Sequence, residues 1–480
     1  MSERIDLVEL ARRAPVHFVG VAGAGVSSLA ELVLRGGGRV SGCDLKPGEI
    51  GDALAKKGAD IVAGHDAAHI ANASAVITTA AVPADHPELV AARARGIPVL
   101  KRAAALGAIV NQGRVVAIAG THGKTSTTAM TTMVLEAGGM EPTGFVGGRV
   151  AAWGGGLRLG RSDLFVVEAD EYDRSFHALR PDVAVVTTLE PDHMEVFGTL
   201  EAIEQAFETF IEPVPAHGLV ALCADDEGAY DMAHRVRRGH VLLYGLMESA
   251  ELRAHDVVQS GSSMRFEVTL RGEPLGPIAL QMPGLHNVRN ALAALAVGLH
   301  LGVTVDDARR GLAGFRTVAR RFSVLGEVGG VVIVDDYAHH PTEVRATLDA
   351  ARSAYEGRRV IAVFQPHLYT RTRDFHEGFG QALARADEVW LTDVFAARER
   401  PIDGVTGELI ARAARAAGAS VHYHETIEAL EPELRDAIRR GDVLITMGAG
   451  DIDRVARGMW QHLNDHADTA PSESAVRRPA

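Results

Sequence analysis

The chain has 480 residues, which is too long for one hydrophobic core and predicts two to four domains. Its apolar fraction is 47% and its charged fraction 23%, the balance of a globular protein rather than of a disordered or fibrous one. The formal net charge of −13 argues against a general binder of nucleic acid or of anionic membranes, because such proteins need a net basic face. Small anionic substrates remain possible, since backbone amides and a few cations can hold them.

The N-terminus and the cysteines indicate the compartment. The first fifteen residues are charged and lack an apolar signal core, and no apolar run approaches the length that spans a membrane. The two cysteines, Cys43 and Cys223, are a single distant pair, which is weak support for a disulfide scaffold. We therefore expect a cytoplasmic protein with no membrane insertion.

The first unit alternates short apolar strands with helices. Strands are expected at 16–20, 38–44, 59–64, 74–80 and 96–100. This alternation predicts a parallel sheet with helices on both faces.

A Gly-rich turn, residues 20–25, follows the first of these strands. Asp44 lies at about the distance of the acid in a dinucleotide fingerprint, although Ala22 stands where that fingerprint has glycine. The turn alone is compatible with a nicotinamide enzyme, with the diphosphate of another nucleotide, or with a turn that only packs a helix on a strand.

The second unit carries the strongest motif. Strands are expected at 114–120, 164–170 and 183–189, a helix at 200–213, an antiparallel patch at 262–272 and a helix at 286–302. The run GTHGKTSTT begins at Gly120, directly after the first of these strands. Its glycines let backbone amides converge on a phosphate, Lys124 supplies a point charge, and Thr125 can reach Mg²⁺. It differs from the common nucleotide loop, because Ile118 stands where that loop has glycine.

Acidic and amide side chains downstream suit a nucleotide site. Glu168 and His193 follow the ends of two strands, where open α/β sheets bind ligands, and could complete a Mg²⁺ site. The alternative for these residues is an acidic solvated loop. Asn287 and Asn290 lie three residues apart at a helix start and could pair with an adenine edge, although Asn287 alone would more simply cap the helix.

The third unit begins near Arg320. Strands are expected at 331–337, 358–365, 387–393, 420–424 and 442–448. Polar clusters follow several of them, which indicates a separate domain that contributes to a substrate site. The polar tail 467–480 is predicted to be disordered.

In their order these motifs resemble the Mur ligase family. The matching segments are 20–30, 41–44, 120–130, 168–176, 190–193, 286–295, 335–344, 364–375 and 448–452. The likeness is greatest to the member that joins L-alanine to UDP-N-acetylmuramate. Thr188 is a departure, since family members often have asparagine there.

The resemblance implies three α/β domains. A UDP-sugar-binding Rossmann-like domain would cover 1–110, a central P-loop ATPase domain with a mixed sheet 111–316, and a Rossmann-like C-terminal domain 317–466. The expected UDP-sugar residues are Gly20, Ala22, Gly23, Ala24, Gly25, Asp44, Thr78 and Thr79. The expected ATP residues are Gly120, Thr121, His122, Gly123, Lys124, Thr125, Ser126, Asn287, Asn290, Arg321 and Asp336.

The resemblance also implies the roles at the reacting centre. Thr125, Glu168 and His193 would hold Mg²⁺, His367 and Arg371 would bind the amino acid, and the catalytic residues would be Lys124, Glu168, His193 and His339. The substrates would be ATP, UDP-N-acetylmuramate and L-alanine, with no nucleic-acid partner, and the protein would be a monomer or a weak homodimer. Some Mur ligases hold Mg²⁺ with a carbamylated lysine, but no lysine follows Lys124 in this chain.

Three other readings stay open. A recycling ligase of the same family would attach the tripeptide L-alanyl-γ-D-glutamyl-diaminopimelate to the same UDP-sugar. An NAD(P)-dependent oxidoreductase would explain the first turn but not the P-loop or Glu168. A P-loop switch protein would bind or hydrolyse ATP without needing a UDP-sugar.

Overall fold

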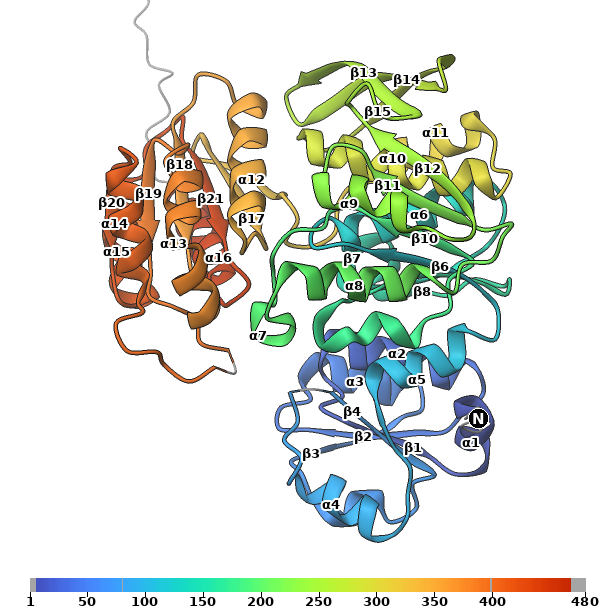
Figure 1. Cartoon of the computed structure of the whole chain (residues 1–480). Helices are drawn as coiled ribbons and strands as arrows, with labels where there is room; N and C mark the ends of the chain where they lie inside the picture. The colour runs from blue at the N-terminus through green and yellow to red at the C-terminus, as the bar shows by residue number, and fades with distance from the viewer. Residues whose placement is uncertain (1–5, 80, 398, 468–480) are drawn as a thin grey trace, which may run out of the picture. The chain divides into compact units, whose positions relative to one another are not determined.

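The computed structural model describes residues 6–79, 81–397 and 399–467 and contains three sheets (Figure 1). The chain divides into two compact units. The first comprises 1–258, 264–281 and 286–319, and the second comprises 259–263, 282–285 and 320–480. All but the first residue of the predicted tail 467–480 lies outside the described residues. No helix among the described residues is long and apolar enough to cross a membrane.

The first sheet has five parallel strands in the order β3-β2-β1-β4-β5. They are β1 (Val16–Val19), β2 (Val40–Asp44), β3 (Asp60–Ala63), β4 (Ala75–Thr78) and β5 (Val99–Lys101). The helices are α1 (Leu7–Arg13), α2 (Ala24–Arg35), α3 (Gly48–Lys56), η1 (Ala67–Ile70), α4 (Pro87–Ala94) and α5 (Arg102–Val110). Every residue of β1 and β4 is buried, as expected for strands covered on both faces. The strand order reverses between β1 and β4, which is where open α/β sheets bind ligands.

The second sheet has ten strands in the order β15-β14-β13-β12-β11-β10-β6-β9-β7-β8. The strands are β6 (Arg114–Ala119), β7 (Thr143–Val150), β8 (Gly155–Arg158), β9 (Leu164–Glu168), β10 (Val183–Val186), β11 (Leu219–Cys223), β12 (His240–Gly245), β13 (Leu252–Ser260), β14 (Ser263–Leu270) and β15 (Glu273–Leu280). The helices are α6 (Lys124–Ala137), η2 (Ala151–Trp153), η3 (Tyr172–Ala178), α7 (Met194–Phe197), α8 (Leu200–Ile211), α9 (Glu227–Asp231), η4 (Met232–Arg235), α10 (Leu285–His300) and α11 (Val305–Gly314). Parallel pairs around β6 and the antiparallel pairs β14–β15 and β7–β8 confirm the mixed sheet.

Helix α6 follows the P-loop and is buried along most of its length. Its buried threonines satisfy their hydroxyls within the helix: Thr128 Oγ1 donates to the carbonyl of Lys124 and Thr132 Oγ1 to that of Thr128, each at 2.8 Å. Helix α11 packs closely on α6, because a Cβ at Gly311 would lie only 2.8 Å from the carbonyl oxygen of Met133. The loop therefore leads into a buried, closely packed helix.

The third sheet has six strands in the order β16-β17-β21-β18-β19-β20. They are β16 (Ser323–Val328), β17 (Val331–Asp336), β18 (Val360–Phe364), β19 (Glu388–Leu391), β20 (Val421–Tyr423) and β21 (Val443–Met447). Helices α12 (Pro341–Ala354), α13 (Tyr369–Leu383) and α14 (Gly407–Ala416) pack on one face, and α15 (Ile427–Ala437) and α16 (Asp453–Ala467) pack on the other. Only the edge strand β16 is antiparallel, so this unit is Rossmann-like as expected.

Candidate active site

The P-loop joins β6 to α6, and its two glycines are required by geometry. Gly120 has φ +132° and Gly123 has φ +81°, conformations that residues with side chains rarely adopt. A Cβ at Gly120 would lie 2.1 Å from Thr187 Oγ1, and one at Gly123 would lie 2.6 Å from Asn290 Oδ1. Any larger residue would displace the loop from its neighbours.

Two threonines after β10 brace this loop. The amide of His122 donates to Thr188 Oγ1 at 2.8 Å, and the amide of Thr121 donates to the carbonyl of Thr188 at 2.9 Å. Thr187 Oγ1 donates to the carbonyl of Ala119 at 3.2 Å. Sequence reasoning missed this role, although both threonines follow a strand that neighbours β6, and that position could have suggested it.

Lys124 is folded onto its own loop and paired with an acid. Its Nζ donates to the carbonyls of Gly120 at 2.6 Å and Thr121 at 3.2 Å, and lies 2.8 Å from Glu171 Oε2. Burial disfavours the charged lysine, but the carboxylates of Glu171 and Asp170 outweigh it and raise the pKa of Lys124. Lys124 is therefore a charged group fixed in position at the start of α6. Glu171 was not singled out from the sequence, where it is one of several acids in a row.

Glu168 ends β9 and faces the P-loop threonine. Its Oε1 accepts from Thr125 Oγ1 at 2.8 Å, and its Oε2 accepts from the amide of Gly147 at 2.6 Å. A carboxylate and a hydroxyl at this spacing are oxygen donors of the kind that Mg²⁺ prefers, so the residues fit the ion. His193 is the N-cap of α7 and lies beside Glu171, with Nε2 3.8 Å from Glu171 Oε1. An imidazole suits Mg²⁺ less well than oxygen.

Both predicted adenine residues are buried at the start of α10. Asn290 Nδ2 donates to Asn287 Oδ1 at 3.3 Å, and Asn290 Oδ1 faces Gly123 of the P-loop. The structure thus places Asn290 against the P-loop, with Asn287 as its hydrogen-bond partner.

The Gly-rich turn of the first sheet has a different arrangement from a dinucleotide site. Asp44 ends β2, and its carboxylate accepts from the amides of Ala22 at 3.2 Å and Lys46 at 3.0 Å. The carboxylate therefore holds the turn itself. Helix α2 begins at Ala24 after Gly23, which provides no side-chain cap for its amides.

A cation that sequence reasoning missed lies at this turn. A Cβ on Gly25 would be only 3.0 Å from Nη1 of Arg102, and Nη2 of Arg102 lies 3.6 Å from Asp170 Oδ2. A guanidinium beside a helix N-terminus favours an anion there. Thr78 ends β4, on the other side of the strand-order reversal, and Thr79 follows it, with its Oγ1 accepting from the amide of Ala81 at 3.3 Å. The signal for Arg102 is its place directly after β5.

In the second unit, the predicted residues lie just before β16, at the end of β17, and after β17 and β18. Asp336 is buried, and its two carboxylate oxygens accept from the amides of Phe322 at 2.7 Å and Ala338 at 2.8 Å. Burial raises the pKa of Asp336 to about 6, against the opposing charge of Arg321. Arg321 stacks over the ring of Tyr337, with 5.2 Å between its guanidinium carbon and the ring centroid.

The predicted amino-acid residues also lie together. The rings of His339 and His367 have centroids 6.1 Å apart, and Arg371 Nη1 lies 3.4 Å from His367 Nδ1. His339 Nδ1 lies 2.9 Å from the carbonyl of Tyr337. The carboxylate of Asp374, which could have paired with Arg371, binds the neighbouring Arg373 at 2.7 and 3.1 Å.

Family models match three successive segments of the chain. They are described as the Mur ligase family catalytic domain, over residues 15–114, the Mur ligase middle domain, over 118–298, and the Mur ligase glutamate ligase domain, over 320–450.

Individual relatives extend this likeness over nearly the whole chain. The UDP-N-acetylmuramate–L-alanine ligase of Salinibacter ruber is 44% identical over 472 residues, which are 98% of this chain and 99% of the relative. The solved UDP-N-acetylmuramate–alanine ligase of Thermotoga maritima is 30% identical, with TM-score 0.79, over 94% of this chain and 99% of that one. A murein peptide ligase from Psychrobacter arcticus is 25% identical, with TM-score 0.70, over the same shares. With its fold and its P-loop geometry, the chain belongs to the Mur ligase family.

Proposed function

We propose that the protein is an ATP-dependent ligase that joins L-alanine to the carboxylate of UDP-N-acetylmuramate, a step of peptidoglycan precursor synthesis. The observation that carries the proposal is the phosphate loop with its held Lys124 and its Thr125–Glu168 pair. Relatives that match this chain over nearly its whole length are named as UDP-N-acetylmuramate–L-alanine ligases.

The reaction needs carboxyl activation. An amine cannot expel oxide from a carboxylate, so the γ-phosphoryl group of ATP is first transferred to the carboxylate, giving an acyl phosphate and ADP. The amine of L-alanine then attacks the acyl carbon. Collapse of the tetrahedral intermediate breaks the bond to phosphate and forms the amide. The protein's part is to position the reactants and to neutralise charge.

In the first unit, the P-loop would supply that neutralisation. The loop amides and Lys124 would bind the β- and γ-phosphates, and Asn287 and Asn290 would hold the adenine. Thr125, Glu168 and His193 would hold Mg²⁺, which supplies positive charge to the phosphates when bound. The Glu171 carboxylate fixes the ammonium of Lys124 on the loop before ATP binds.

The turn at the N-terminus of α2 would hold the UDP diphosphate. Asp44 fixes the turn backbone and is therefore occupied, whereas a nicotinamide enzyme would use this acid on a ribose. Arg102 adds positive charge at the first turn of α2. Thr78 and Thr79 would contact the nucleotide from the end of β4.

The second unit would contribute residues that contact ATP and residues that bind L-alanine. Arg321 and Asp336 would contact the γ-phosphate and the ribose of ATP. Arg371 would bind the carboxylate of L-alanine, and a neutral His339 could accept the proton that its ammonium loses. Nδ1 of His339 lies 2.9 Å from the carbonyl of Tyr337 and 3.1 Å from Glu343 Oε2, and these contacts orient the ring.

Isotope transfer tests the acyl phosphate. With oxygen-18 in the carboxylate of the sugar substrate, one label should appear in the phosphate released during turnover with L-alanine. Unlabelled phosphate would mean direct hydrolysis of ATP, and a P-loop switch protein would then be the better account.

Sedimentation of the protein should show a monomer or a weak homodimer.

A further inference from the structure

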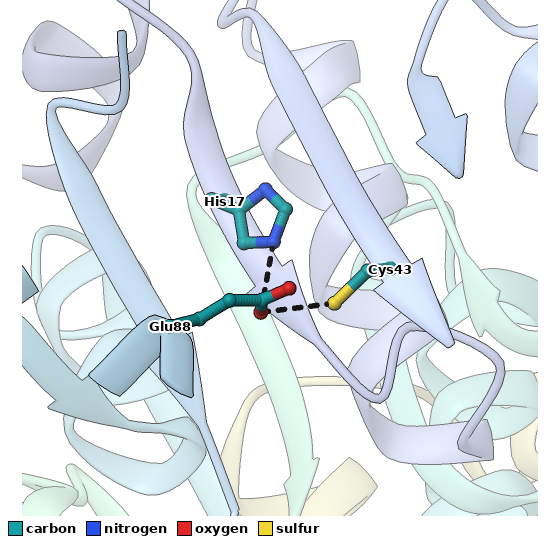
Figure 2. Close-up of side chains that lie close together, drawn as sticks. All are labelled: His17, Cys43 and Glu88. Carbon is teal, nitrogen blue, oxygen red and sulfur yellow. Dashed lines mark hydrogen bonds and ion pairs between the residues drawn. The ribbon is translucent and has the colours of Figure 1, made fainter. Parts of the chain in front are cut away.

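A cluster of buried metal-binding side chains lies on the face of the first sheet that is covered by α4 and η1. His17 comes from β1, Cys43 from β2 and Glu88 from α4, and both of the first two point toward the carboxylate of Glu88 (Figure 2). All three side chains are at most 1% exposed. The proposed ligase reaction uses none of them, so their grouping needs a separate explanation.

The distances within the cluster suit a small cation. Glu88 Oε2 lies 3.4 Å from His17 Nε2 and 3.0 Å from Cys43 Sγ, and the three donor atoms lie within 4.8 Å of one another. Ligands at 2.0–2.3 Å from a tetrahedral zinc ion are separated by about 3.3–3.8 Å. The donors therefore stand close to the spacing that zinc imposes.

A further donor lies within reach. His65 Nδ1 is 3.2 Å from Cys43 Sγ and 3.9 Å from Glu88 Oε1. The ring of His86 lies 4.5 Å from that of His65, and His65, His86 and Glu88 also have donor atoms within 4.8 Å of one another. His65 is about one-fifth exposed, which gives an ion a route from solvent.

Buried nitrogen atoms in the cluster lack hydrogen bonds. Within the described part of the chain, both ring nitrogens of His86 have no hydrogen-bond partner, and Nε2 of His17 contacts Glu88 Oε2 at 3.4 Å without the geometry of a hydrogen bond, although both side chains are more than nine-tenths buried. An unsatisfied buried polar atom costs about 1–3 kcal/mol. His17 Nε2 points at Glu88, so a cation placed between them would satisfy both.

Neighbouring groups orient the donors as they do around known metal sites. Ser41 Oγ is 3.0 Å from His17 Nδ1, which leaves Nε2 as the ligand atom. His69 Nδ1 lies 2.9 Å, and the amide of Asp66 3.2 Å, from Glu88 Oε1, so this oxygen is held in place while Oε2 faces His17 and Cys43. Such outer contacts commonly fix the ligands of metal ions.

We propose that His17, Cys43 and Glu88 bind one zinc ion, with His65, whose Nδ1 lies 3.2 Å from Cys43 Sγ, as the fourth donor. A thiolate, imidazoles and a carboxylate form a donor set that favours zinc over Mg²⁺. Without the ion, burial and the Glu88 carboxylate raise the pKa of the Cys43 thiol, so binding would release its proton to solvent. Because the carbonyl of Cys43 accepts from the amides of Gly20 and Val21, at 2.8 and 3.0 Å, the ion would also steady the Gly-rich turn.

Cobalt substitution tests the site in the full-length protein. After treatment with a chelator, the protein is titrated with Co²⁺ in excess Mg²⁺, which occupies oxygen sites, and the near-ultraviolet thiolate-to-cobalt absorption is followed. We expect the band to saturate at one equivalent and to disappear when Zn²⁺ is added. The Cys223→Ser variant is the matched control, because Cys223 is the other buried free cysteine, and it should keep the band.

The Cys43→Ser variant, which changes only sulfur to oxygen, should lose the band. His17→Gln keeps the thiol and should weaken cobalt binding by at least about tenfold, with circular dichroism confirming that both variants are folded. A wild-type protein that binds cobalt without a thiolate band overturns the proposal, as does a band that survives in Cys43→Ser or an unchanged affinity in His17→Gln. In each case the cluster would be only a hydrogen-bonded network.

Discussion

The Lys124–Glu171 pair makes a double prediction for the Lys124→Ala variant. Loss of the loop cation should lower kcat by at least about 10²-fold, as for removal of one transition-state donor. The side chains of Lys124 and Glu171 are only 14% and 5% exposed, so the truncation also leaves a buried carboxylate without its partner. Breaking such a pair costs up to about 3–5 kcal/mol, or roughly 6–20 °C in the melting of a domain of this size. A lysine on an exposed loop would cost almost nothing.

Two variants separate these effects, with phosphate release and thermal melting as the assays. Adding Glu171→Gln to Lys124→Ala removes the unpaired charge and should recover most of the stability but none of the activity. Lys56→Ala, at an exposed lysine of α3, is the control and should change neither. Near-normal activity of folded Lys124→Ala would refute the phosphate assignment. A double variant no more stable than the single one would refute the account of the buried pair.

Three further predictions concern metal support, pH and the amino acid. Because no lysine follows Lys124, activity should not depend on bicarbonate, and a carbamate near Glu168 or loss of activity on CO₂ removal would contradict this. The raised pKa of Asp336 means that the folded state binds its proton more tightly than the unfolded state, so this group's contribution to stability falls as the pH rises from about 4 to 6. The test is urea unfolding followed by tryptophan fluorescence in a Trp153→Phe background, where the two remaining tryptophans both lie in the second unit. The free energy of unfolding with Asp336 present should exceed that of the Asp336→Asn variant by about 1 kcal/mol more at pH 5 than at pH 7. An equal difference at the two pH values would show that the pKa of Asp336 is not raised. Arg371→Ala should raise the KM for L-alanine by about 10–100-fold and change the KM for ATP little, whereas the control Arg373→Ala should change neither. Equal changes of both KM values in Arg371→Ala would mean that Arg371 has only a structural role.

The pattern of apolar residues predicted those strands of the three sheets that are buried on both faces. It placed β1, β6, β10 and β17 at their observed positions, because such strands form continuous apolar runs. The edge strands β8 and β16 were not predicted. Their residues are only partly buried and carry no such signal.

The residues of the candidate site were likewise predicted only in part. Lys124 and Glu168 could be chosen because their types and their places after strands indicate chemistry. Glu171, Thr188 and Arg102 were not singled out, since their roles depend on partners that are distant in the sequence, and only the fold brings these partners together. The cluster at Glu88 has the same origin, because its members come from separate elements across 72 positions of the chain.

The choice of amine tests the central claim most directly. The protein is given ATP, Mg²⁺ and UDP-N-acetylmuramate with equal concentrations of L-alanine and L-alanyl-γ-D-glutamyl-diaminopimelate, and the products are identified by mass. We predict that UDP-N-acetylmuramoyl-L-alanine predominates. Glycine should compete modestly, because one methyl group in an apolar pocket is worth only about 1–3 kcal/mol. A product that carries the tripeptide as the main species would contradict the account and identify a recycling ligase instead.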